Sequence, residues 1–197
     1  MKRLSTVCPV LMALLIGLVS ASLGAQTRPS GTSNWQIDSK RADFEGYTTF
    51  TIRCESIADK LVSLCLVYRK YDKPEASSFE IFLEDANHLH NTLAWYINCD
   101  KIDYKWDSGD IVRGPWDRQH DISVSDMGGF AKQAYVPNDK RADFLNSLCS
   151  AKLLSFRFEF DGQERIARMD VSGLVDFLAK NKLTQDEIAA AMNNATF

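Results

Sequence analysis

Three histidines give this chain its clearest capacity for metal chemistry: His88 and His90 in "DANHLHN", and His120 further along. On a strand, His88 and His90 would point to the same side, and His120 from a neighbouring strand could approach them. Three neutral imidazoles can hold a catalytic zinc ion and leave its fourth position for water. The alternative is a solvated loop, because turn-forming Asp and Asn residues surround the pair. The sequence favours the loop, so we expect no metal and no cofactor.

Other catalytic patterns are weaker. The sequence contains neither a Gly-x-Ser-x-Gly elbow for a serine nucleophile nor a glycine-rich phosphate loop. Carboxylate pairs such as Glu84–Asp85, or Asp117 with Asp121, could exchange protons with a substrate. Charged residues at such positions are more often solvated, so the sequence favours a binding protein over an enzyme.

Four cysteines follow the N-terminal segment: Cys54, Cys65, Cys99 and Cys149. An even number in an exported chain is typical of disulfides, and no close Cys pair indicates a zinc or redox motif. Three pairings are conceivable. We expect Cys54–Cys65 to join two neighbouring strands and Cys99–Cys149 to join a strand to a helix end.

The segment "YKWDSGDIVRGPWDRQ" is the best candidate for partner binding. Trp106 and Trp116 flank a turn-rich loop that also carries Arg113 and Arg118. Exposed Trp and Arg side chains contribute much of the binding energy at protein interfaces. The alternative is that both tryptophans cover the core.

The elements that would position these residues are mainly strands. Alternating or β-branched apolar patterns predict strands at 47–55, 61–68 and 77–85. Further strand patterns occur at 91–99 and 101–106, and shorter ones at 120–126 and 129–136. Trp35 and Phe44 are expected to anchor the first ordered segment in the core.

The last third of the chain mixes helices with a hairpin. A helix is expected after Pro137, with Asn138 or Asp139 as its cap. Asp161–Gly162 predicts the turn of a hairpin whose return strand continues with Ile166 and Met169. A short helix capped by Ser172 follows, and Thr184 with Glu187 predicts a capping box for the last helix. The fold class is therefore mainly β with a few short helices, as an antiparallel β-sandwich or rolled sheet.

Residues 1–25 resemble an export signal. Lys2 and Arg3 precede the apolar run Pro9–Val19, and small residues follow, with cleavage expected after Ala25 or else after Ala21. Residues 26–34 predict a flexible lead-in, and 35–197 a single β-rich domain with C-terminal helices. Losing Lys2 and Arg3 changes the net charge from −3 to −5, which argues against nucleic-acid binding. A periplasmic or secreted protein without stable membrane insertion is expected.

The second half resembles the module that ends the invasion-associated locus B proteins, a family of exported bacterial proteins. The helix "FLNSLCSA", the strands around "LLSFRFEF" and "ERIARMDV", and the helix start "SGL" carry the resemblance. The matching positions are Leu148, Leu154, Phe156, Ser172, Gly173 and Leu174, with Trp35, Cys54 and Cys65 in the first half. The segment around residues 103–121 departs from the family's pattern. The resemblance implies an exported β-sandwich without enzymatic activity, and no catalytic residue is transferred by it.

Three functions follow as hypotheses. The first is a soluble exported protein that binds another envelope or host protein. The second is a small zinc-dependent hydrolase that uses His88, His90 and His120. The third is an inhibitor or immunity protein directed against a periplasmic toxin.

Overall fold

The computed structural model describes residues 34–85, 97–118, 130–131, 133–160 and 162–194, and residues 33–197 form one compact unit. The expected signal, all three histidines and most of the lead-in lie outside the described residues. Among the described helices, none combines the length and apolar character that crossing a bilayer requires.

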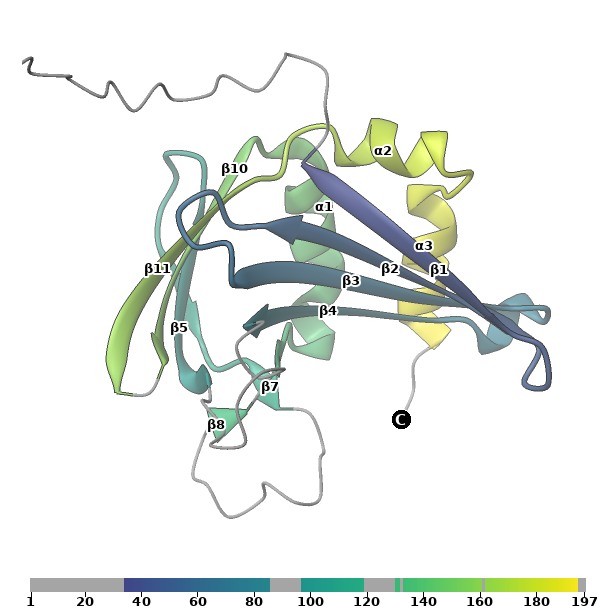
Figure 1. Cartoon of the computed structure of the whole chain (residues 1–197), viewed down its shortest axis with the longest axis horizontal. Helices are drawn as coiled ribbons and strands as arrows, with labels where there is room; N and C mark the ends of the chain where they lie inside the picture. The colour runs from purple at the N-terminus through teal and green to yellow at the C-terminus, as the bar shows by residue number, and fades with distance from the viewer. Residues whose placement is uncertain (1–33, 86–96, 119–129, 132, 161, 195–197) are drawn as a thin grey trace, which may run out of the picture. The chain divides into compact units, whose positions relative to one another are not determined.

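Two antiparallel sheets make up most of the fold (Figure 1). Sheet A has six strands in the order β1-β2-β3-β4-β9-β7. Its strands are β1 (Trp35–Ala42), β2 (Tyr47–Glu55), β3 (Val62–Tyr71), β4 (Ser78–Asp85), β9 (Gln133–Tyr135) and β7 (Asp117–Arg118). Sheet B has the order β11-β10-β5-β6, and β8 also pairs with β5. Its strands are β11 (Gln163–Asp170), β10 (Leu153–Phe160), β5 (Ile97–Trp106), β6 (Val112–Gly114) and β8 (Phe130–Ala131). This arrangement confirms the predicted mainly-β fold.

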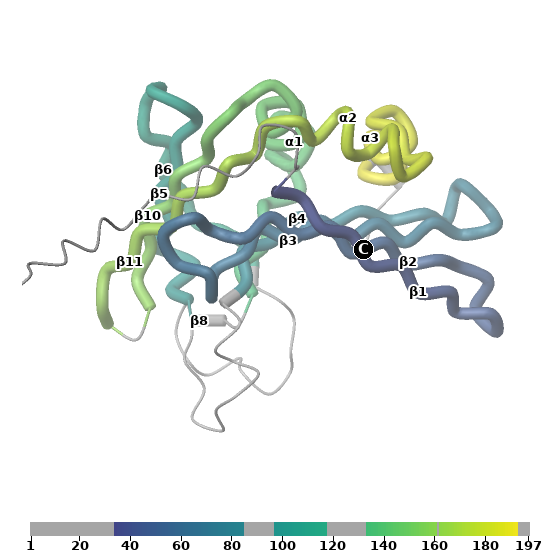
Figure 2. Tube along the Cα trace, turned by 45° about the horizontal axis from the view of Figure 1, so that its top comes forward, coloured from purple at the N-terminus to yellow at the C-terminus, as the bar shows by residue number. Residues whose placement is uncertain are grey.

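Three short helices accompany the sheets: α1 (Arg141–Ser150), α2 (Leu174–Lys180) and α3 (Gln185–Asn194). Figures 1 and 2 show β5, β10 and β11 running across the direction of β1–β4, with α3 near the far ends of β3 and β4. The 3-10 turns η1 (Pro74–Ala76) and η3 (Asn138–Lys140) precede β4 and α1. The inner faces of both sheets and the three helices share one hydrophobic core.

The β10–β11 hairpin shows how sequence alternation builds this core. Leu154, Phe156, Phe158 and Phe160 are buried, while Arg157 between them is exposed. A two-residue connection joins Phe160 to its partner Gln163, and Gly162 has φ +71, as the predicted turn requires. Ile166 and Met169 both lie on the return strand, as predicted, but they face opposite sides. Successive strand residues face opposite sides, so Ala167 and Met169 point inward and Ile166 is 52% exposed.

Helix starts were predicted with mixed success. At α3, the Glu187 N–H donates to Thr184 Oγ1 at 3.1 Å and the Thr184 N–H donates to Glu187 Oε2 at 3.1 Å, which confirms the capping box. Ser172 does not cap α2. Its hydroxyl donates to Asp170 Oδ1, and Gly173 with φ +74 precedes the helix. The stretch 138–140 forms η3 instead of the start of α1, for which Lys140 is the N-cap.

A corner contact fastens the β2–β3 turn of sheet A to β11 of sheet B. Ser56 Oγ accepts a hydrogen bond from the Arg168 N–H at 3.1 Å, and the Ile57 N–H donates to the Arg168 carbonyl at 2.6 Å. Asp59 forms an ion pair with Arg165, whose guanidinium lies 5.0 Å from the centre of the Phe160 ring. Nearby, the Trp35 indole N–H donates to the Val171 carbonyl at 3.2 Å. Trp35 is thus a core anchor, as predicted.

Candidate binding groove

The two tryptophans expected at a partner site belong to an aromatic cluster in the core. Trp116 is only 4% exposed, and its ring centre lies 5.7 Å from Phe144 and 5.6 Å from Phe156. Trp106 is half-buried and lies 4.8 Å from Phe144. The alternative interpretation is therefore correct for Trp116, which is buried and covers the core between sheet B and α1.

The two arginines of the predicted patch lie in different sheets. Arg113 is exposed in β6 of sheet B, and Arg118 lies in β7 of sheet A, where its backbone pairs with Ala134. The Arg118 side chain is outside the described part of the structure. Because the chain crosses between sheets at Pro115 and Trp116, the structure does not bring the four predicted residues together on one surface.

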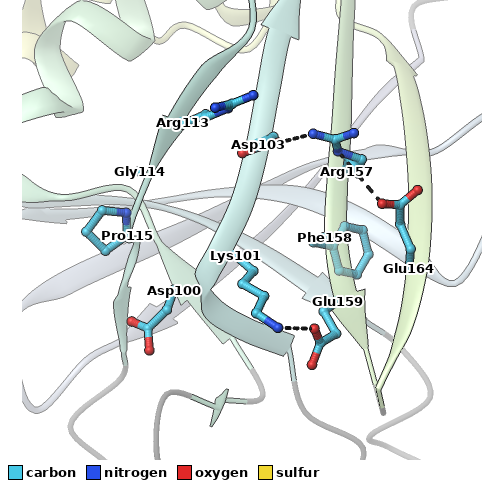
Figure 3. A pocket seen from close by; sticks show the side chains of 10 residues that line it. All are labelled: Asp100, Lys101, Asp103, Arg113, Gly114, Pro115, Arg157, Phe158, Glu159 and Glu164. Carbon is cyan, nitrogen blue, oxygen red and sulfur yellow. Dashed lines mark hydrogen bonds and ion pairs between the residues drawn. The ribbon is translucent and has the colours of Figure 1, made fainter.

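Arg113 instead lines a groove on the outer face of sheet B (Figure 3). One hollow of about 560 Å³ lies over the β6, β5 and β10 strands, and a second of about 240 Å³ adjoins it. Asp103 and Arg157 line both hollows. We call the two hollows together the groove.

Strand register places the groove residues in rows across the sheet. One row runs from Arg113 through its β5 partner Asp103 and its β10 partner Arg157 to Ile166 of β11. In the next row, Ser155 lies between Lys105 and Arg168. Side chains at these positions point away from the core because their strand neighbours point inward.

Ion pairs hold several groove side chains in place (Figure 3). Lys101 Nζ lies 2.6 Å from Glu159 Oε2, and this hydrogen bond lowers the pKa of Glu159 below its usual value. Arg157 pairs with Asp103 and lies 3.9 Å from Glu164. Glu159 therefore stays ionised at neutral pH. A general acid must hold a proton at that pH, so Glu159 is not suited to this role.

The groove is electrically polarised along its strands. The acidic end carries Asp100, Glu159 and Glu164 with the cation Lys101, and Glu164 also lies 3.9 Å from Arg157. The basic end carries Lys105, Arg113, Arg157 and Arg168 around Asp103 and includes Ile111 and Ile166, each 52% exposed. A ligand that matches this surface has apolar groups and negative charge directed at the basic end.

Sequence reasoning found the β6 side of the groove and missed the β10–β11 side. The segment around Arg113 was singled out for its turns and aromatic residues. Arg157, Ile166 and Arg168 were treated only as parts of a hairpin. The signal was present: alternation around the inward Phe156 and Phe158 already places Arg157 outward, and pairing across the turn puts Ile166 beside it.

The predicted disulfide between Cys54 and Cys65 is wrong for this fold. The two residues lie on neighbouring strands, but Cys54 faces the main core and Cys65 faces the opposite side of sheet A. The Cys54 thiol donates to the Asp170 carbonyl, and the Cys65 thiol donates to Glu84 Oε2 at 3.5 Å. Within the described residues, no disulfide joins Cys99 to Cys149 either.

The zinc hypothesis concerns residues that the structure leaves undescribed. His88, His90 and His120 lie in the ranges 86–96 and 119–129. In the part of the chain that is described, no three His, Cys, Asp or Glu side chains are grouped so that they could hold a metal ion.

Comparisons with known proteins identify no relative of this chain. No protein-family model, curated protein or solved structure matches this chain.

Proposed function

We propose that this protein is exported to the bacterial periplasm or beyond, where it binds another envelope or host protein through the groove of sheet B. The observation that carries the proposal is the pairing of exposed apolar side chains with unbalanced positive charge at the basic end. Ile111 and Ile166 line one hollow together with three cations, Lys105, Arg157 and Arg168, and one carboxylate, Asp103. Isolated exposed apolar residues are ordinary, but a hollow that combines them with arginines has the composition of a protein contact.

The form of the groove suits a protein segment. It lies open along four strands and is lined mostly by long charged side chains, whereas sites for small molecules are enclosed and mainly apolar. Its cations would steer an acidic segment toward the basic end and fix its direction. The apolar groups of that segment would cover Ile111 and Ile166.

Export is the second part of the proposal, and the N-terminal segment supports it. A short basic start, an apolar core and small residues precede Gln26. The resemblance to invasion-associated locus B proteins favours the same location. N-terminal sequencing of the periplasmic protein should begin at Gln26 or at Ser22. Full-length protein retained with the membrane would contradict export.

Affinity capture from envelope extract tests binding at the groove. The wild type is compared with Arg113→Glu and Ile166→Glu, which reverse charge or add it at the basic end. Val175→Glu is the matched control, because Val175 is also exposed but lies on α2. We expect one protein to be retained by wild type and control and lost with both groove variants. Equal retention by all four forms, or by none, would contradict the proposal.

A further inference from the structure

The β1–β2 turn presents an apolar side chain that the fold does not use. Phe44 was expected to anchor the first segment in the core, yet it is completely exposed (103% relative accessibility). Its neighbours Asp43 and Glu45 are exposed as well, so the tip carries a phenyl ring between two carboxylates. A ring that contacts nothing within its own fold is available to a partner.

The chain holds this tip firmly in place. The Arg41 guanidinium contacts both Asp72 carboxylate oxygens, at 3.0 and 2.9 Å, and so ties the base of the turn to the end of β3. The Gly46 N–H donates to the Ala42 carbonyl at 3.0 Å, and the Asp72 N–H donates to the Gly46 carbonyl at 2.9 Å. Because the turn is already ordered, inserting Phe44 into a partner costs little additional ordering.

The basic end of the groove complements this tip in both charge and size. Two carboxylates flank Phe44, and three cations, Lys105, Arg157 and Arg168, line the same hollow as Ile111 and Ile166. The hollow beside these isoleucines measures about 240 Å³. That is below the roughly 300–1,000 Å³ of typical small-molecule sites and suits a single inserted side chain.

The tip cannot reach the groove of its own molecule. Figures 1 and 2 both place the β1–β2 turn and β11 at opposite sides of the described unit. Any contact between the two surfaces is therefore between molecules.

We propose that the partner at the basic end of the groove is a second copy of this chain, which inserts Phe44 between Ile111 and Ile166. Asp43 and Glu45 of that copy then face the groove cations. This inference rests on the proposed role of the groove as a protein-binding surface, and it identifies the envelope protein bound at the basic end as a second molecule of this same chain. The two surfaces differ, so the contact is head-to-tail and repeats into a ring or a linear chain of molecules.

Two variants separate the two halves of the contact. Phe44→Ser removes the inserted ring and leaves the groove intact, whereas Ile166→Glu repels the acidic tip and leaves the ring intact. Both residues are exposed, so neither change should affect folding, and circular dichroism melting checks this. Val175→Ser and Val175→Glu are the matched controls. Each protein is expressed from its full coding sequence, purified as the cell processes it and studied by sedimentation velocity over increasing concentration.

We expect the wild type and both Val175 controls to associate as concentration rises. Phe44→Ser and Ile166→Glu should each weaken association by at least about tenfold, because each removes a central contact. A mixture of the two variants should form a one-to-one pair, since one supplies the ring and the other the groove.

Three results would overturn the inference: a wild type that stays monomeric at every concentration, a Phe44→Ser variant that associates like the wild type, or a mixture that fails to pair. Failure here is distinct from failure of the proposed function. If the wild type is monomeric but still captures an envelope protein that Ile166→Glu loses, the groove binds a different partner.

Discussion

The outer faces of the two sheets carry similar residue types and use them in opposite ways. Sheet A carries a small apolar cluster whose side chains pack against one another and are largely buried: Cys65, Val67, Phe82 and Tyr135. On sheet B, the groove leaves its apolar residues open between charged side chains. Both faces arise from the same strand alternation, so alternation by itself does not tell a closed face from an open one.

The polar groups account for the difference. On sheet A, Glu84 accepts hydrogen bonds from Gln133 and Cys65, and the Tyr135 hydroxyl donates to Gln133 at 2.8 Å. These groups satisfy one another over the cluster. On sheet B, Lys105 and Arg168 line the smaller hollow, whose lining contains the single carboxylate Asp103. The second arrangement leaves charge available to a partner.

Truncation of a cluster residue should have the largest effect on stability. Phe82 is 6% exposed although it lies on the outer face of sheet A, so Phe82→Ala should lower the free energy of unfolding by about 3 kcal/mol. Ile166→Ala on the outer face of sheet B should change it by less than about 0.5 kcal/mol. Urea denaturation measures both. Similar losses in the two variants would contradict the contrast between the faces.

Removal of an ion pair should likewise cost more stability at the corner contact than in the groove. Asp59 and Arg165 at the corner contact are each 22% exposed at their side chains, whereas Lys101 in the groove is 64% exposed. Arg165→Met should cost about 1–2 kcal/mol, because Asp59 then remains partly buried without its cation. Lys101→Met should cost less than about 0.5 kcal/mol. The contrast fails if Lys101→Met is the more destabilising change.

Alkaline pH should reduce the stability that the sheet A cluster contributes. Burial, and secondarily Glu84, raises the pKa of Cys65 above its usual 9.0; burial, and secondarily Glu80, raises that of Tyr135 above 10.0. A group with a raised pKa in the folded state contributes its full stability below its unfolded pKa and loses it as pH rises. The melting temperature should therefore decline above about pH 9.

The double variant Cys65→Ala with Tyr135→Phe removes both groups and is the control for this prediction. Its melting temperature should fall less than that of the wild type between neutral and alkaline pH. Parallel curves for the two proteins would show that other groups are responsible.

The smallest effect on stability should accompany a large effect on binding. Arg157→Gln removes the groove cation that pairs with Asp103 and Glu164, and because the position is exposed we expect the midpoint of urea denaturation to stay unchanged. The affinity for the partner of the groove should nevertheless fall by about tenfold or more. Titration calorimetry with the identified partner measures this affinity. Unchanged affinity would remove Arg157 from the interface.

Local patterns in the sequence predicted local structure well. The capping box of Thr184 and Glu187 and the turn at Gly162 were correct because each depends on contacts within a few residues. The sequence patterns at 91–99 and 101–106 predicted two strands, but residues 97–106 form a single strand, β5. The local pattern does not show that the strand continues from one stretch into the next. Arg113 was correctly placed in an exposed segment, whereas its groove partners were not identified.

The amino-acid sequence alone determined three features of this chain: its high strand content, the position of its hairpin turn and the start of its last helix. Residue alternation indicates the strands, and contacts between near neighbours decide the turn and the helix start. Tertiary structure decided which side of each strand is covered. Trp116 is buried because α1 brings Phe144 against it, Phe44 is exposed because its turn extends past the core, and Cys54 and Cys65 face apart because sheet A separates them. Each of these outcomes depends on residues distant in sequence, so the pattern around the residue itself could not reveal it.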